Sequence, residues 1–171
     1  PKSGTVLDIG CSTGNIGNAL RPTLESRTAN FIPIEASKEM ADLYAGPNKD
    51  GLLVADVTDI EIPPFDVAIC FLVLMFIPPE RREKLMERLR ASRKKGGVII
   101  VFDKFESPYG YIGTVMWRLA LAGKVATGVD ATDIIQKELS LMGTQRPLMQ
   151  NETTDMTKVF QFGNFAGWVI D

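Results

Sequence analysis

A glycine-rich turn is the stretch of this sequence best suited to chemistry. It spans residues 8–14, Asp-Ile-Gly-Cys-Ser-Thr-Gly, and its first two residues end the apolar run 5–9. Small residues in such a turn let the backbone approach a ligand closely, and the following helix N-terminus favours negative charge there. The residues expected to line a binding site at this turn are Asp8, Gly10, Cys11, Ser12 and Gly14.

Two familiar interpretations of this turn do not fit. A dinucleotide fingerprint, G-x-G-x-x-G, would need glycine at positions 12 and 15, where Ser12 and Asn15 stand. The letters of Gly10–Gly14 also match the G-x-S-x-G nucleophile elbow, but without histidine Ser12 lacks its usual base. A tight strand-to-helix turn that binds nothing remains a structural alternative.

Acids stand where two later apolar runs end. Glu35 follows the run 31–34 and lies 21 residues after Gly14, and Ala36 comes next. A carboxylate at that position can accept hydrogen bonds from both hydroxyls of a ribose. Asp56 and Val57 follow the run 52–55. Each acid alone is weak evidence, but the ordered set of turn and acids points to an adenosyl ligand.

The composition excludes several classes of site. The chain has no histidine, which removes Ser-His-Asp and Cys-His catalysis and any histidine-ligated metal. Cys11 and Cys70 are the only cysteines, too few for a four-cysteine cluster. We therefore expect no metal cofactor. The net charge of −2 excludes a globally basic nucleic-acid binder.

The same composition sets expectations for location. The longest apolar run, 67–77, is too short to span a bilayer, so we expect no membrane partner. No targeting segment is visible at the start, and two cysteines fit a reducing compartment. We therefore expect a cytoplasmic location.

The elements that position the turn alternate between strand and helix. The alternation predicts an α/β, Rossmann-like fold with a mostly parallel sheet and helices on both faces. We expect Pro33 to weaken the second strand, Pro22 to stop the first helix, and Gly96-Gly97 to end the third helix. The expected strands are 5–9, 31–34, 52–55, 66–74 and 98–102, and the expected helices are 15–20, 37–44 and 79–93.

After the fifth strand the rhythm changes. Residues 111–121 and 132–142 predict two helices, within a helical insertion of about 108–145 in a single domain, 1–171. Residues 159–162 and 165–170 predict an antiparallel hairpin at the sheet edge, whose Gly163-Asn164 turn suits type II′. We expect the following aromatic residues in the core: Trp117, Phe160, Phe162, Phe165 and Trp168.

The basic residues of the segment 81–95 allow two interpretations. The run carries eight arginines and lysines with two glutamates between them, and it could contact RNA phosphates. A solvated helix face with Glu–Lys pairs such as Glu80–Lys84 is the interpretation we favour.

The chain resembles the class I S-adenosylmethionine (SAM) dependent methyltransferases, and within them the carboxy-S-adenosylmethionine synthases. Those enzymes have a methyltransferase fold and make carboxy-SAM from SAM and prephenate for tRNA wobble-uridine modification. The resemblance runs along almost the whole chain. The segments that carry it are 9–14, 56–60, 71–77 with 79–81, 103–105, 160–161 and 164–165.

The resemblance implies roles for the residues singled out above. The glycine turn shapes the methionine pocket, Glu35 holds the ribose, Asp56 accepts from the adenine amino group, and Val57 offers its backbone N–H. Cys70 and Phe71 face the sulfonium. The implied donor is SAM, with S-adenosylhomocysteine (SAH) as product. Tyr109 and Tyr111 are candidates to line an acceptor site, although packing between the two added helices is the simpler interpretation.

Three functional hypotheses follow from these residues. The leading one is a SAM-dependent methyltransferase whose acceptor is a small molecule or is related to tRNA. A carboxy-SAM synthase-like enzyme is an alternative, in which Glu138 stands where the family has a carboxylate-binding arginine and would repel that group. A non-catalytic SAM-binding module that needs a partner is the other, suggested by the lack of the family's N-terminal cover. A homodimer is also compatible with the pattern.

Overall fold

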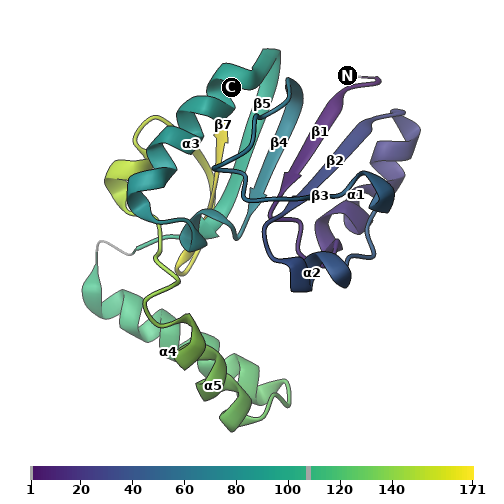
Figure 1. Ribbon diagram of the computed structural model, residues 1–171. Helices are drawn as coiled ribbons and strands as arrows, with labels where there is room; N and C mark the ends of the chain where they lie inside the picture. Colours follow the sequence, from purple (N-terminus) through teal and green to yellow (C-terminus); the bar gives the residue numbers. More distant parts are fainter. Residues whose placement is uncertain (1, 107–108) are drawn as a thin grey trace.

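A seven-stranded mixed sheet forms the centre of the molecule (Figure 1). The computed structural model describes residues 2–106 and 109–171. The strands follow the order β3-β2-β1-β4-β5-β7-β6, in which only the pairings of β7 are antiparallel. The strand bounds are β1 Thr5–Ile9, β2 Asn30–Glu35, β3 Leu53–Val54, β4 Phe65–Phe71, β5 Arg93–Lys104, β6 Thr157–Phe162 and β7 Phe165–Ile170. The expected fold class, mostly parallel with an antiparallel edge, is confirmed.

Helices lie on both faces of the sheet. The hydrophobic core joins Leu85 and Leu89 of α3 to alternate residues of the central strands, such as Leu7 and Val101. On the opposite face Gly17 of α1 lies against Phe31 of β2. The helix bounds are α1 Asn15–Ser26, α2 Lys38–Asp42, α3 Pro79–Ser92, α4 Gly110–Ala126 and α5 Ala131–Leu141, with short 3-10 turns η1 Lys49–Gly51, η2 Leu74–Phe76 and η3 Gln150–Thr153.

The expected weakening of β2 by Pro33 is not seen, because no ladder hydrogen bond is required at that position. β3 pairs only with Ile34 and Glu35, so its ladder does not reach Pro33. The carbonyl of Ile34 accepts from Gly10 on the β1 side, which directs Pro33 toward the β3 side. The missing N–H of proline therefore falls where no ladder bond is required.

Two expected helix stops are wrong, Pro22 for the first helix and Gly96-Gly97 for the third. α1 continues through Pro22 to Ser26, because Pro22 lies on the exposed face and Leu24 still packs inward. α3 ends at Ser92, and Gly96 and Gly97 lie inside β5. A Cβ on Gly97 would lie 2.9 Å from the carbonyl oxygen of Asp66, so this glycine serves a close strand approach.

The C-terminal hairpin forms as expected, but not all of its aromatic side chains lie in the core as expected. Gly163 has φ +59° and Asn164 has no positive φ, as a type II′ turn requires. Trp168 is buried, whereas Phe160 and Phe162 are exposed. These two side chains stand on β6, the edge strand, where no further element covers them.

Helices α4 and α5 form an arm that projects from the carboxyl edge of the parallel strands (Figure 1). Residue 108, where we expected the insertion to begin, lies outside the described residues. α4 has no buried residue, and the expected core position of Trp117 is wrong because its side chain is 45% exposed. None of the helices in the described part of the chain has the length and apolarity of a membrane span.

Candidate functional site

The glycine turn is fixed to the end of β2 by backbone hydrogen bonds. The N–H groups of Gly10 and Cys11 both donate to the carbonyl of Ile34, at 2.8 and 3.0 Å. Gly10 and Gly14 have φ of +67° and +96°, and Ser12 between them has φ +50°. The turn therefore follows a left-handed path at three positions, which glycine tolerates without strain and serine does not.

Glu35 connects this turn to α2. Its carboxylate accepts from the N–H of Ser12 and from the N–H of Ser37, each at 2.8 Å, and the residue is only 9% exposed. Ser37 in turn caps α2 by accepting from Met40 N. The structure thus brings Glu35 and Ser12 together as the sequence predicted, with exposed Ala36 beside them.

Asp8 is a buried acid without a partner beneath the turn. It is 1% exposed, and its Oδ2 is the buried side-chain oxygen or nitrogen in the described residues that has no hydrogen bond. Burial, with a smaller effect of the Glu35 charge, raises the pKa of Asp8 to about 7. Burial, followed by the same two acids, raises the pKa of the Cys11 thiol to about 12.

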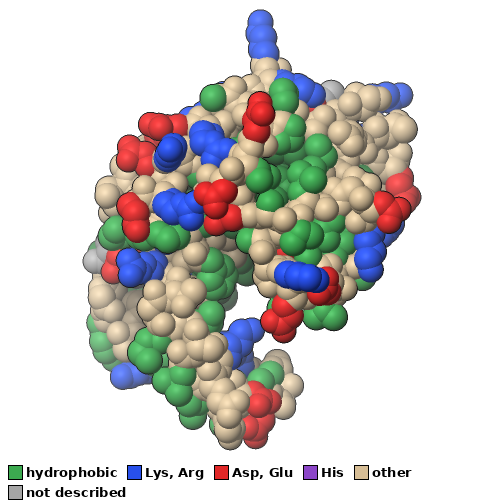
Figure 2. All heavy atoms as spheres, viewed as in Figure 1, with side chains coloured by type: hydrophobic (Ala, Val, Ile, Leu, Met, Phe, Trp, Pro, Cys, Tyr) green, Lys and Arg blue, Asp and Glu red, His purple; other side chains and the backbone are tan. Residues whose placement is uncertain are grey.

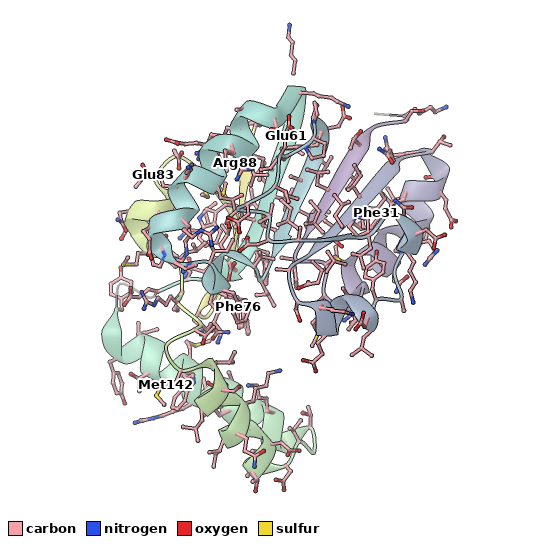
Figure 3. All side chains as sticks on the ribbon, in the orientation of Figure 1. Phe31, Glu61, Phe76, Glu83, Arg88 and Met142 are labelled. Atoms are coloured by element: carbon pink, nitrogen blue, oxygen red, sulfur yellow. The ribbon has the colours of Figure 1, made fainter. Side chains whose placement is uncertain are left out.

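The Asp56–Val57 segment is held by its own turn and by α3. Asp56 Oδ1 accepts from the N–H and the hydroxyl of Thr58, at 2.8 and 2.7 Å. Partial burial opposes the charge on Asp56, but these bonds and Arg81, 3.5 Å away, keep its pKa below the usual range. Arg88 reaches the same segment and donates to the carbonyl of Thr58 at 2.8 Å (Figure 3).

The arginines of α3 are therefore not only a solvated face. Arg82 is 3% exposed; it donates to the carbonyl of Ile77 and pairs with Glu152 at 3.0 Å. Arg81 also pairs with Asp59. These pairings could not be predicted from the sequence, because long arginine side chains reach partners that lie far away in the chain.

Cys70 does not reach the surface. Its side chain is 0% exposed within the core, and burial, with lesser effects of Asp103 and Asp8, raises the pKa of its thiol to about 12. A neutral thiol so enclosed is a poor nucleophile. Phe71, the next residue, is 38% exposed and stacks on Phe102 with ring centroids 4.8 Å apart. Of the two residues expected to face a ligand, Phe71 alone is accessible.

Asp103 is a site residue that the sequence reasoning did not single out. It is fully buried at the end of β5, and its Oδ2 accepts from the N–H groups of Val73 and Met75, at 3.1 and 3.2 Å. Val73 lies against the glycine turn, since a Cβ on Gly10 would be 2.5 Å from Val73 Cγ2. Asp103 therefore fixes the loop after β4 against the turn after β1. An acid at the end of a strand was the available signal.

The two candidate tyrosines lie near the start of the arm. Tyr109 and Tyr111 are 68% and 76% exposed, so neither is packed between α4 and α5. Figure 2 shows a hollow between the arm and the body of the molecule. Phe76 of η2 projects from the body on the arm side of α3, and Met142 follows the last residue of α5 (Figure 3).

Glu138 on α5 is surrounded by cations. Its carboxylate pairs with Lys124 at 3.2 Å and accepts from Trp117 Nε1 at 3.4 Å. Lys104, at the end of β5, donates to Gln145 on the return from the arm. Burial is the main cause that lowers the pKa of Lys104, with Glu138 opposing the shift and Lys124 adding to it. The negative charge expected at Glu138 is therefore compensated.

Together these elements place small residues, two acids and one exposed aromatic ring along the carboxyl ends of neighbouring parallel strands. Glu35 ends β2, the glycine turn follows β1, and Phe71 ends β4. In open α/β sheets this edge is where ligands bind. The arrangement suits a nucleoside with an attached amino acid better than a phosphate chain, because its charged groups are acids and would repel phosphate.

Comparison with known sequences agrees with this geometry. The family described as "Methyltransferase domain" matches residues 6–97, more than half of the chain. A carboxy-S-adenosyl-L-methionine synthase from Shewanella loihica is 26% identical over 170 residues, covering 95% of this chain and 70% of the relative. A protein of the same name from Shewanella sp. strain ANA-3 is 27% identical over 149 residues, covering 83% and 61%. The resemblance recognised in the sequence is confirmed.

Solved structures share the fold at low identity. CalO1, a methyltransferase of calicheamicin biosynthesis solved with SAH, aligns with a TM-score of 0.60 at 16% identity, over 99% of this chain and 49% of its own. The cyclopropane synthase MmaA2 from Mycobacterium tuberculosis aligns with a TM-score of 0.60 at 15% identity, over 92% and 56%. The chain thus spans about half the length of these neighbours.

Proposed function

The chain belongs to the SAM-dependent methyltransferase family, and from that premise we propose that it binds SAM at the carboxyl edge of β1, β2 and β4 and transfers its methyl group. The observation that carries the proposal is the contact of Glu35 with Ser12, which puts an acid directly beside the glycine turn. The family relationship supports SAM as the donor, and the contact supports its proposed position.

The residues present fit this donor. Glu35 would hold the ribose hydroxyls, and Asp56 with the N–H of Val57 would hold the adenine. The glycine turn would surround the methionine end, near the unpaired buried oxygen of Asp8. A buried carboxylate oxygen without a hydrogen-bond donor favours a cationic ligand such as an α-ammonium or a sulfonium.

Methyl transfer from a sulfonium needs alignment and a dry site more than it needs a base. The lack of histidine is therefore no obstacle. Asp103 contributes by holding the loop that contains Val73 against Gly10, which fixes the shape of the pocket. Phe71 provides an accessible apolar surface where β4 ends.

We propose a small molecule, or a group destined for tRNA, as the acceptor. Carboxy-SAM synthesis is the second candidate, supported by the names of the relatives and by Lys124, which compensates the charge of Glu138. A cytoplasmic location is proposed with either activity, supported by two buried free cysteines. We also propose that the chain forms a homodimer, which analytical ultracentrifugation tests by measuring the mass in solution.

The test begins with mass spectrometry of the compound released from the purified protein by mild denaturation. SAM or SAH supports methyl transfer, and carboxy-SAM supports the second candidate. Turnover is then followed as SAH formation with candidate acceptors, using Glu35→Gln as the control with an impaired ribose site. SAH that forms in the isolated chain excludes the hypothesis of a module without catalysis.

A further inference from the structure

A second pocket lies between the start of the arm and the C-terminal hairpin. Its volume is about 660 Å³, within the range of ligand-binding clefts. It shares no residue with the glycine turn, and it lies at the β5–β7–β6 side of the sheet. The lining residues come from the end of β5, the first turns of α4, η3 and the hairpin.

The floor of this pocket is aromatic and rigid. Phe105 and Trp168 are 5% and 1% exposed and meet edge to face, with ring centroids 5.5 Å apart. Ile112 and Met116 of α4 and Met156 near β6 add apolar walls. Such a lining favours a compact apolar body, because apolar walls over a floor fixed by burial cost the protein little conformational entropy on binding.

One positive charge stands in this pocket without a counter-charge. Lys158 is the sole charged residue of the lining, which contains no aspartate or glutamate. Its Nζ lies 4.9 Å from the centroid of the Phe105 ring and donates to Gln161 Oε1 at 2.9 Å. In the described part of the chain no carboxylate forms an ion pair with it. Two of its three N–H groups are thus available to a ligand.

Neutral polar groups complete the lining. Gln150, Thr154 and Asn164 face the same space, and Asn164 belongs to the hairpin turn. The buried hydroxyl of Thr153 is already satisfied, since it donates to the carbonyl of Gln150. Amide and hydroxyl groups at a rim orient a ligand without imposing a charge of their own.

We propose that this pocket binds a small molecule with a flat aromatic body and one anionic group, such as an aromatic carboxylate. The aromatic body packs against Ile112, Met116 and Met156, above the buried rings of Phe105 and Trp168, and the anionic group pairs with Lys158. The proposal concerns binding at this pocket alone, so it stands or falls separately from the SAM site.

The chemistry of the lining selects this class. A cationic aromatic compound would meet the charge of Lys158, and a dianion would find only one basic side chain. A purely apolar compound would leave that cation unpaired, although the ring of Phe105 already stabilises it partly. A monoanion satisfies both the ring and the cation.

The test uses 4-nitrobenzoate as the probe, because nitroaromatic rings quench tryptophan fluorescence at short range. The chain has two tryptophans, and Trp117→Phe leaves Trp168, on the pocket floor, as the sole reporter. The neutral analogue 4-nitrobenzamide has nearly the same shape. Lys158→Gln removes the charge, and Lys49→Gln, an exposed lysine on η1, is the matched control.

We expect saturable quenching by 4-nitrobenzoate in the Trp117→Phe protein and in its Lys49→Gln derivative. Lys158→Gln and the neutral amide should each weaken binding about fivefold or more, the order expected for one partly shielded ion pair. Circular dichroism and melting temperature confirm that each variant is folded. Equal binding of the two probes, an unchanged Kd in Lys158→Gln, or quenching that rises linearly without saturation would overturn the proposal.

Discussion

The glycine turn makes a quantitative prediction about Gly14→Ala. Gly14 has φ +96°, and a Cβ there would lie 2.5 Å from the backbone N of Gly46 and 2.7 Å from its Cα. Backbone cannot rotate aside as a side chain can, so the segment that contains Gly46 must move. That segment is tied to the turn by Ala45 N donating to Thr13 O at 3.0 Å and by Asn18 Nδ2 donating to Ala45 O at 3.1 Å.

The size of the effect follows from these contacts. An alanine forced into left-handed backbone costs roughly 1–2 kcal/mol. The loss of two hydrogen bonds adds about 0.5–1.5 kcal/mol each, which gives a total of about 2–5 kcal/mol. Gly96→Ala is the matched control, because Gly96 has φ +76° and no atom lies within 4 Å of an added Cβ. The Gly96→Ala variant should lose only the free energy that left-handed backbone costs an alanine, roughly 1–2 kcal/mol.

Urea denaturation at pH 7 measures both free energies of unfolding, and calorimetric titration with SAH measures both affinities. Gly14→Ala should bind SAH at least about tenfold more weakly, since displacement of the turn removes its fit to the ligand. Gly96→Ala should bind SAH with the affinity of the original protein, because Gly96 lies near the start of β5, at the edge of the sheet away from the glycine turn. The reasoning is refuted when the two variants lose the same stability, or when Gly14→Ala keeps its affinity.

Three further changes test the site. Glu35→Gln replaces one acceptor oxygen by a donor and should weaken SAH binding about tenfold by calorimetry, with little change in melting temperature; an unchanged Kd would contradict the ribose role. Because the pKa of Asp8 is raised to about 7 in the folded state, its protonated form stabilises the fold at low pH. The free energy of unfolding should therefore fall as pH rises from about 4 to about 7, and Asp8→Asn should flatten that slope in urea titrations; an equal slope would argue against it. Arg82→Met removes a buried pair with Glu152 and should cost about 3–5 kcal/mol, against at most about 1 kcal/mol for the more exposed Arg90→Met; similar losses would show that burial of Arg82 matters little.

Much of the fold was predictable because local signals agree with the tertiary structure. The run Thr5–Ile9 forms β1 with those bounds, and Gly163 takes the positive φ that a type II′ turn requires. Pro79 begins α3 as its fixed φ favours. In each case the signal is local: an apolar run for the strand, a glycine that accepts positive φ for the turn, and a proline with fixed φ for the helix start.

Boundaries that depend on tertiary contacts were not predictable. Pro22 lies inside α1 because its ring faces solvent while Leu24 is anchored in the protein. Gly97 lies within β5 because the carbonyl of Asp66 approaches it closely. Neither the exposure of a proline nor the neighbour of a glycine can be derived from spacing along the chain.

The candidate site shows the same division. Glu35 and the glycine turn were found from type and order, since both lie at strand ends. Asp103 and Arg82 were missed because their partners, Val73 and Glu152, lie 30 and 70 residues away in the chain. Cys70 was placed beside Phe71 correctly in sequence, but alternation along β4 turns its side chain into the core.

The central claim is that this chain binds SAM through its glycine turn and Glu35. Calorimetric titration of SAM into the purified protein, with the melting temperature measured in parallel, tests it most directly. The account predicts one binding event per chain, a raised melting temperature, and weaker binding in Glu35→Gln. The absence of both a heat of binding and a shift in melting temperature at saturating SAM would contradict the claim.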